Sequence, residues 1–599
     1  MNPGTIPAED TWDLGAVFDG DESFAAARRR LEASLPALAA ARGGLALSAT
    51  ALADALERAA EAYRTWSALH GYASCLSDGD LRVADHRALR QAIELLGTRV
   101  AEALSYLRPE ILEMPPGRIE EFIAVEPRLA PHAFFLRDLL RQREHVLGAP
   151  EERILSQAGL LSQSAGALYN VLNNSELPRP EFVLGTGGRL RLTPVAFHAA
   201  RSTATRDDRR RMFPVYFGAY RAFRDTLGQN LFNALKTHLF RARSRGYASC
   251  LAASLDAANV PVEVYRTLIR EARERRPLLH RYIELRAELL ETERLEYPDL
   301  YGPLGPRPAP CFSPGDARRL VCESLTPLGR RYREALLRAF ERRWIDWHPA
   351  PGKRSGAYAT GAAYDAHPFV LLNFTGDFES VSTLAHEMGH AMHSHFSNSV
   401  QPFVTAGYPV FVAEVASTVN EGLLLRHAIE HATDRDERLY LLGTYLDGLR
   451  GTLFRQAMFA EFELAIHECV EHGEVPTGES LDRTYLDLLR DYHGHAAGIM
   501  RVGDEYAVEW AAIPHFYLDF YVYQYATGIT AATALCEQLI GDEAACERYL
   551  AFLSAGGSDH PLALLRRAGV DLETRAPYEA TFRAFERGLA ELRELVDSR

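Results

Sequence analysis

The chain has 599 residues, of which 47% are hydrophobic and 24% are charged. This ordinary globular composition excludes a disordered chain, a collagen-like fibre and a small scaffold built from disulfides. Asp and Glu number 80 against 66 Lys and Arg, and the resulting formal charge of −14 opposes sequence-independent binding to nucleic acid.

Several further features concern the compartment. The sequence has no run of the ~18 to 20 apolar residues that a membrane helix needs, so we expect no membrane partner. The first residues lack the charged and apolar regions of a signal peptide. The seven cysteines are odd in number and never spaced CxxC, which is typical of buried free thiols in a reducing compartment. Together these features predict a cytoplasmic protein.

Helical periodicity dominates the first part of the chain. Apolar residues three and four positions apart predict helices over four segments, at 22–42, 47–70, 84–107 and 151–172. Two alternating runs around glycines at 181–192 then predict a β-hairpin.

The second part of the chain is also mainly helical. Helical patterns resume over 206–294, and six prolines within 296–314 indicate an irregular connection. A β-like patch follows at 355–375, in which 368–374 resembles a strand. The patterns after it are helical. We therefore predict a mostly α-helical protein with a small β-sheet beside the active-site helix.

An HExxH motif carries the clearest chemical signal. Four residues along a helix correspond to ~400° of rotation and ~6 Å of rise, so His386 and His390 share one face, where two imidazoles can bind one Zn²⁺. The carboxylate of Glu387 lies beside them and could act as a general base on a metal-bound water. The alternative to a metal site is a buried helix whose histidines only form hydrogen bonds with neighbouring groups.

A catalytic zinc site needs a third protein ligand. The metzincin pattern would require Gly at position 393 and His at position 396, but these are His393 and Phe396. His393 shares the face of the first two histidines, yet three ligands on one straight helix cannot close a tetrahedron. Glu414 follows His390 by 24 residues in an apolar stretch, where a carboxylate is costly unless it is paired or binds metal. We expect Glu414 to be the third ligand, from a second helix.

Glu421 lies two helical turns beyond Glu414 on nearly the same side. It could accept the N–H of a ligand imidazole, the usual support for zinc-bound histidine. The alternative is a carboxylate on the helix surface.

The HEMGH motif and the following segment 411–417 resemble peptidase family M3 of zinc metallopeptidases, and more narrowly oligoendopeptidase F. The resemblance extends along the chain, through segments at 11–14, 297–304, 504–528 and 556–562. It implies a two-lobed, neurolysin-like helical fold with a deep substrate channel. An N-terminal helical lobe of the oligoendopeptidase F type would occupy residues 1–200, and the zinc peptidase domain residues 201–599.

The resemblance also assigns roles to residues. His386, His390 and Glu414 fall on the zinc-ligand positions and Glu387 on the general base. His515 and Tyr523 would stabilise the oxyanion. The alternatives for the tyrosine are Tyr517 and Tyr521, which compete for this role, and packing of all three rings in a core helix. Segment 368–374 would be the edge strand that pairs with the backbone of the substrate.

Motif and resemblance together predict a cytoplasmic, zinc-dependent oligoendopeptidase. It would hold one Zn²⁺ per chain and cut internal bonds of short, unstructured peptides. One alternative is a carboxypeptidase of the same fold. Another is a catalytically silent protein that binds zinc or peptides, which the intact Glu387 opposes. A helical DNA-binding protein is opposed by the charge balance.

Overall fold

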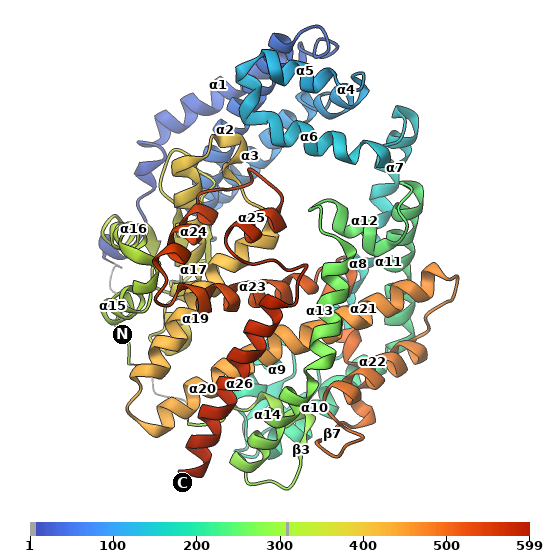
Figure 1. Ribbon diagram of the computed structural model, residues 1–599, viewed down its shortest axis with the longest axis vertical. Helices are drawn as coiled ribbons and strands as arrows, with labels where there is room; N and C mark the ends of the chain where they lie inside the picture. The colour runs from blue at the N-terminus through green and yellow to red at the C-terminus, as the bar shows by residue number, and fades with distance from the viewer. Residues whose placement is uncertain (1–6, 307–310, 599) are drawn as a thin grey trace. The chain divides into compact units, whose positions relative to one another are not determined.

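The computed structural model describes residues 7–306 and 311–598, so part of the proline-rich connection, 307–310, lies outside the described residues (Figure 1). Helices make up most of the structure, as the sequence patterns predict. Two compact units divide the chain, and each is built from three segments. Unit 1 comprises Met1–Glu144, Ala309–His427 and Leu535–Val570, and unit 2 comprises His145–Pro308, Ala428–Ala534 and Asp571–Arg599. The division of the sequence at residue 200 remains a prediction.

Unit 1 begins with the helices predicted for the first hundred residues. A hydrophobic core that includes Phe24, Leu52 and Ile93 joins the first three of them. The second helix continues nine residues past its predicted end because Tyr72, Ala73 and other residues in the extension are also buried. The helices of this unit are α1 (Asp21–Ala39), α2 (Ala49–Gly79), α3 (Ala84–Ala103), α4 (Leu107–Glu113), α5 (Arg118–Val125), α6 (Ala133–Arg141), α15 (Pro314–Ser324), α16 (Gly329–Glu341), α17 (Phe378–Val400), α18 (Phe403–Ala406), α24 (Glu543–Leu553) and α25 (Pro561–Arg567).

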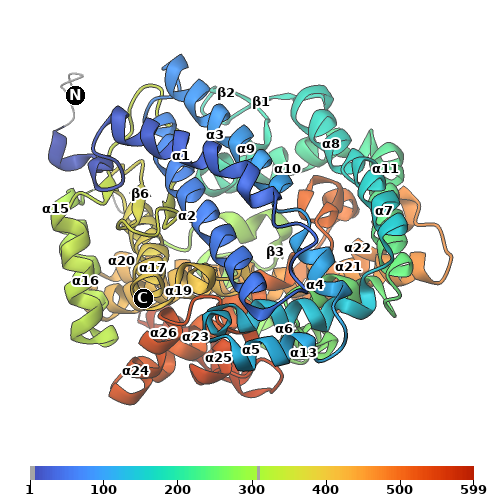
Figure 2. The ribbon, with the colours of Figure 1, turned by 90° about the horizontal axis from the view of Figure 1, so that it is seen from above.

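A three-stranded sheet in unit 1 confirms the predicted β-structure at 355–375. Its strand order is β4 (Ile345–Asp346), β6 (Phe369–Leu371) and β5 (Tyr358–Thr360). β6 pairs in parallel with β4 and antiparallel with β5, and it lies beside α17 (Figure 2). The prediction that segment 368–374 forms an edge strand is therefore wrong. Both sides of β6 are already occupied by neighbouring strands, and β5 is an edge of this sheet.

Unit 2 contains the predicted hairpin, in which β1 (Glu181–Val183) pairs antiparallel with β2 (Arg189–Arg191). A short parallel pair joins β3 (Leu295–Glu296) to β7 (Met500–Arg501). The predicted helix at 151–172 is broken at Gln163 into two helices. The helices of this unit are α7 (Ala149–Ser162), α8 (Ser164–Val171), α9 (Pro194–Thr203), α10 (Arg206–Arg221), α11 (Arg224–Ser244), α12 (Cys250–Asp256), α13 (Val262–Glu274), α14 (Arg276–Leu289), α20 (Arg435–Leu449), α21 (Arg455–Glu471), α22 (Gly478–Tyr492) and α26 (Ala576–Asp597).

Two helices contain residues at which the chain passes from one unit to the other, α19 (Val410–His431) and α23 (Tyr523–Leu539). Within the described ranges, none of the helices is long and apolar enough to cross a membrane. All seven cysteines are free, and four of them are buried, but Cys311 is exposed. The expectation of buried thiols is therefore wrong for Cys311, which lies within the proline-rich connection, and Cys322 and Cys469 are only partly buried.

Candidate active site

The HExxH motif lies in the middle of α17, a helix that is anchored at its start and along one face. The side chain of Asp377 caps the helix by accepting a hydrogen bond from the backbone N–H of Ser380 at 2.9 Å. The apolar stripe expected from the sequence is fully buried and consists of Val381, Leu384, Met388 and Met392. Burial of this stripe fixes the rotation of the helix and hence the direction of its histidines.

A close approach between α17 and α19 brings the second helix to the motif. A Cβ on Gly389 would lie 2.5 Å from the Cα of Ser417, so only glycine permits this packing distance. Asn420 on α19 reinforces the contact, because its Nδ2 donates to the carbonyl of Ala385 at 3.0 Å and its Oδ1 accepts from Tyr332 at 3.0 Å. Gly389 lies inside the HExxH motif, but helical periodicity alone does not predict its role in this contact.

Three potential metal ligands converge where the two helices meet. The Nε2 atoms of His386 and His390 lie 3.6 and 3.9 Å from Oε2 of Glu414. The two imidazole rings are 4.9 Å apart and nearly perpendicular, with an interplanar angle of 82°. One ligand atom from each residue lies within 4.8 Å of the other two. Two imidazoles and one carboxylate are a donor set that suits Zn²⁺.

Glu421 orients the first of these histidines. Its Oε2 lies 3.2 Å from Nδ1 of His386, and its Oε1 accepts a hydrogen bond from Ser382 at 3.4 Å. Because Nδ1 donates to Glu421, the lone pair of Nε2 is directed toward Glu414. Burial lowers the pKa of His386, but Glu421 and the neighbouring acids outweigh burial, so the pKa is raised. The Glu421 carboxylate is thus paired with His386 and Ser382 rather than being an isolated surface charge.

The other two ligand residues have their own supports. Ser417 donates to the Glu414 carboxylate at 3.4 Å, and the hydroxyl of Tyr408 donates to the backbone carbonyl of His390 at 3.3 Å. Burial, with a smaller contribution from His386, lowers the pKa of His390 to about 4. His390 is therefore neutral at pH 7, the form in which imidazole binds a metal.

Glu387 is buried beside the ligands, with 7% of its surface exposed. Its Oε2 has no hydrogen-bond partner among the described residues. Its pKa is raised to about 7: burial is the largest cause, His386 opposes it, Glu414 and Glu421 add to it, and a backbone hydrogen bond from Ala359 of β5 lowers it. A carboxylate oxygen that is buried without a partner is costly unless a cation or a reacting group faces it.

His393 takes no part in this cluster. It is buried, and its ring stacks on Tyr408 with centroids 3.6 Å apart and an interplanar angle of 5°. The second additional histidine of the motif, His395, packs near Trp344 at 5.5 Å. Both side chains therefore pack against aromatic rings.

The predicted oxyanion donors lie in unit 2. Nε2 of His515 lies 3.3 Å from the hydroxyl of Tyr525, which is not one of the predicted oxyanion donors. Tyr521 packs against both residues, with its ring centroid 6.1 Å from that of His515 and 5.5 Å from that of Tyr525. Tyr523 points elsewhere: it is 3% exposed and packs on Tyr265 at 5.3 Å.

Tyr517, the remaining competitor, is also a packing residue. Its ring lies 4.7 Å from that of Tyr169, and its hydroxyl accepts a hydrogen bond from Asn230 at 3.3 Å. Burial raises the pKa of this hydroxyl above its usual value. The structure thus groups His515 with Tyr521 and Tyr525, and it separates Tyr517 and Tyr523 from that group.

Comparisons with known proteins agree with the motif. The model of "Peptidase family M3" matches residues 200–303 and 324–584, and that of "Oligopeptidase F" matches residues 110–178. The chain is 36% identical to oligopeptidase PepF of Bacillus subtilis over 99% of this chain and 88% of the relative. It is 35% identical to group B oligopeptidase PepB of Streptococcus agalactiae over 99% of this chain and 98% of the relative.

A solved structure gives the same result for the fold. The crystal structure of oligoendopeptidase-F from Enterococcus faecium matches with a TM-score of 0.73 and 32% identity, over 98% of this chain and 100% of that one. Motif, fold and relatives agree over nearly the whole length of the chain, which therefore belongs to peptidase family M3 and resembles oligoendopeptidase F.

Proposed function

We propose that the chain is a zinc-dependent oligoendopeptidase that hydrolyses internal bonds of short, unstructured peptides. His386, His390 and Glu414 would hold one Zn²⁺ per chain. The observation that carries the proposal is the convergence of these three ligands beside the buried, unpartnered Oε2 of Glu387. When bound, Zn²⁺ supplies Lewis acidity toward a peptide carbonyl and lowers the pKa of water.

Glu387 has the role of general base and acid. Its carboxylate would take a proton from the attacking water and then deliver it to the nitrogen of the leaving amine. The raised pKa of this carboxyl, caused first by burial, supports the role because a base with a pKa near the working pH can both accept and return a proton. A cation held by His386 and His390 would oppose that rise.

Glu421 and Ser382 have a positioning role. They hold the imidazole of His386 in the tautomer whose Nε2 is free to bind a metal. Tyr408 has a related positioning role for His390. Its ring stacks on His393, and its hydroxyl donates to the backbone carbonyl of His390.

For the oxyanion, we propose His515 and Tyr525 as donors, in place of the pair His515 and Tyr523. The hydrogen-bond distance between His515 and Tyr525 supports this choice, and so does the packing of Tyr523 against Tyr265. Tyr523 is buried, with 3% of its surface exposed, whereas Tyr525 is only half-buried and is the more accessible of the two to a substrate.

Strand β5 is the proposed docking edge for the peptide. It is an edge of the sheet, its three residues are partly exposed, and Ala359 in its centre makes the backbone contact with Glu387. An extended peptide could add to this edge by strand pairing, which gives affinity through backbone hydrogen bonds without a strict requirement for side chains. A cavity of 380 Å³ lies nearby, lined by residues that include Ala357, Asn373 and Thr383.

We also propose a cytoplasmic location, which the seven free cysteines support. The experiment that tests the function combines metal analysis with cleavage of a mixed peptide library. Internal cuts together with bound zinc would support an oligoendopeptidase. Trimming from the carboxyl end would indicate a carboxypeptidase, and zinc without cleavage would indicate a binding protein.

A further inference from the structure

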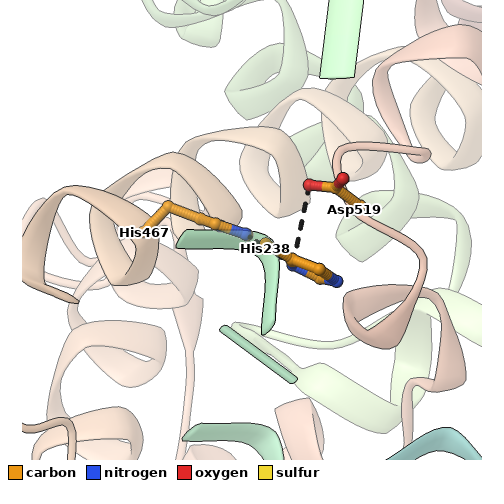
Figure 3. Close-up of side chains that lie close together, drawn as sticks. All are labelled: His238, His467 and Asp519. Carbon is orange, nitrogen blue, oxygen red and sulfur yellow. Dashed lines mark hydrogen bonds and ion pairs between the residues drawn. The ribbon is translucent and has the colours of Figure 1, made fainter. Parts of the chain in front are cut away.

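A second cluster of potential metal ligands lies in unit 2, among residues to which the proposed peptidase chemistry gives no role. It consists of His238 on α11, His467 on α21 and Asp519 in the loop before α23 (Figure 3). One ligand atom from each residue lies within 4.8 Å of the other two. In Figure 3 the His467 imidazole faces that of His238, and the Asp519 carboxylate approaches from the loop.

The distances in this cluster match the edges of a zinc tetrahedron. Zn–N and Zn–O bonds of ~2.0–2.2 Å at tetrahedral angles separate two ligand atoms by roughly 3.3 Å. Nδ1 of His238 lies 3.1 Å from Nε2 of His467 and 3.6 Å from Oδ1 of Asp519. One ion could therefore reach all three atoms with small adjustments of the side chains.

The surroundings direct lone pairs into the cluster. Nδ1 of His467 donates to the backbone carbonyl of Glu463 at 2.7 Å, so its Nε2 carries the lone pair and accepts a hydrogen bond from Nδ1 of His238. A metal ion would take the place of the proton in this hydrogen bond. Oδ2 of Asp519 pairs with Arg241, while Oδ1 is buried and accepts no hydrogen bond from any described residue. An unsatisfied buried carboxylate oxygen costs free energy that a bound cation would recover.

The charges around the cluster are compatible with a cation. Burial lowers the pKa of His238 and His467 to about 4, with smaller contributions from Arg241 and from His238 respectively, so both are neutral ligands at pH 7. Arg241 opposes a cation, but it is paired with the other Asp519 oxygen. Glu463 is a second buried carboxyl, which accepts from the backbone N–H of Phe520 at 2.7 Å and has an unpartnered Oε2. Burial raises its pKa well above its usual value, so it adds a polar group rather than a negative charge.

The loop that carries Asp519 is held in an unusual conformation. Asp519 and Phe520 have φ values of +53° and +59°, in the left-handed region that non-glycine residues rarely adopt. Ser254 donates to the backbone carbonyl of Asp519 at 2.6 Å, and the Phe520 ring packs on His467 at 4.2 Å. The ligand carboxylate is thus presented by a strained turn that neighbouring elements hold in place.

We propose that His238, His467 and Asp519 bind a second divalent transition-metal ion of the zinc class, and that this ion ties the loop at Asp519 to α11 and α21. In the sequence, this loop lies between His515 and Tyr525. Loss of the ion would therefore loosen the segment that carries both residues.

The test counts zinc on the full chain. The protein is stripped with a chelator, reloaded with Zn²⁺ alone, separated from free metal and measured by mass spectrometry of the metal. We expect two zinc ions per chain in the wild type and one in the double variant His386→Ala/His390→Ala. Adding His238→Asn or the nearly isosteric Asp519→Asn to that double variant should remove the remaining ion. Adding His472→Ala, which changes an exposed histidine on the same segment of chain outside the cluster, should leave it bound.

Circular dichroism of each variant separates loss of the site from loss of the fold. Cobalt substitution gives a second readout, since the visible absorption of Co²⁺ bound to the double variant should change with Asp519→Asn. One zinc in the wild type and none in the double variant would overturn the proposal. One zinc in both proteins would support this site while contradicting the zinc ligands of the proposed peptidase centre, so the two proposals fail separately.

Discussion

Glu421 on α19 lies with Oε2 3.2 Å from Nδ1 of His386 on α17, so a carboxylate on one helix sets the tautomer of a histidine on the other. Helix α19 also contributes Glu414, two turns earlier. The same helix therefore supplies both the third potential ligand and the carboxylate that pairs with the first one. This arrangement depends on the close helix contact at Gly389.

The first prediction concerns this support. Glu421→Gln should lower zinc affinity by ~10- to 100-fold, because the His386 N–H loses a charged acceptor. Activity at saturating zinc should fall much less. Titration with a competing chelator measures the affinity. Glu430→Gln, an exposed residue on the same helix, is the matched control and should leave zinc affinity unchanged. Equal affinities for the wild type and Glu421→Gln would contradict the assigned role.

The second prediction separates the third ligand from the additional histidine of the motif. Glu414→Ala should lose bound zinc and activity together. His393→Ala should keep its zinc but lose thermal stability, because its stacking on Tyr408 contributes ~0.5–1.5 kcal/mol beyond the buried area. Metal analysis and a melting curve of each variant test this. Zinc lost from His393→Ala and retained by Glu414→Ala would reverse the assignment.

The sequence predicted the motif helix well, and for a local reason. The spacing of His386 and His390 and the apolar stripe at Leu384 and Met388 follow directly from helical periodicity. Glu414 could be predicted as well, since a carboxylate in an apolar stretch needs a partner. The close packing at Gly389 could not be predicted from the sequence, because helices tolerate an isolated glycine at a cost of ~1 kcal/mol without any close helix contact.

The strand order of the sheet and the direction of individual side chains were harder to predict from the sequence. The run Phe369–Leu371 is apolar throughout and buried on both faces, which is typical of a central strand, but its neighbours come from distant parts of the sequence. In the same way, the tyrosine-rich segment alternates between buried and half-buried rings across a change from 3₁₀-helix to α-helix. A periodicity argument could not distinguish Tyr523 from Tyr525.

The third prediction concerns those two tyrosines. Tyr525→Phe should lower kcat by ~10²–10³, the loss expected for one oxyanion donor, with little change in KM. Tyr523→Phe should retain most of the turnover and instead show a lower melting temperature. Steady-state kinetics on one internally quenched peptide compares the two variants. A larger loss of kcat for Tyr523→Phe would favour the original assignment.

The fourth prediction concerns substrate conformation. If a peptide pairs with the edge of β5, unstructured peptides of roughly 6 to 20 residues should be cut efficiently, and a stable folded protein should resist. N-methylation of a single backbone amide beside the cleaved bond should lower kcat/KM by about tenfold or more. The methyl group removes one N–H donor of the strand pairing and also clashes with the neighbouring strand. Comparable cleavage of the folded protein and the free peptide would contradict strand pairing.

The measurement that tests the central claim most directly is zinc content and turnover of Glu387→Gln, compared on the same preparation. The ligands His386, His390 and Glu414 are untouched in this variant, so it should bind one zinc at this site with near-normal affinity. Its kcat should fall by at least ~10²- to 10⁴-fold, because the amide cannot accept and return the proton. Near-normal turnover with zinc bound would contradict the assignment of Glu387 as the general base.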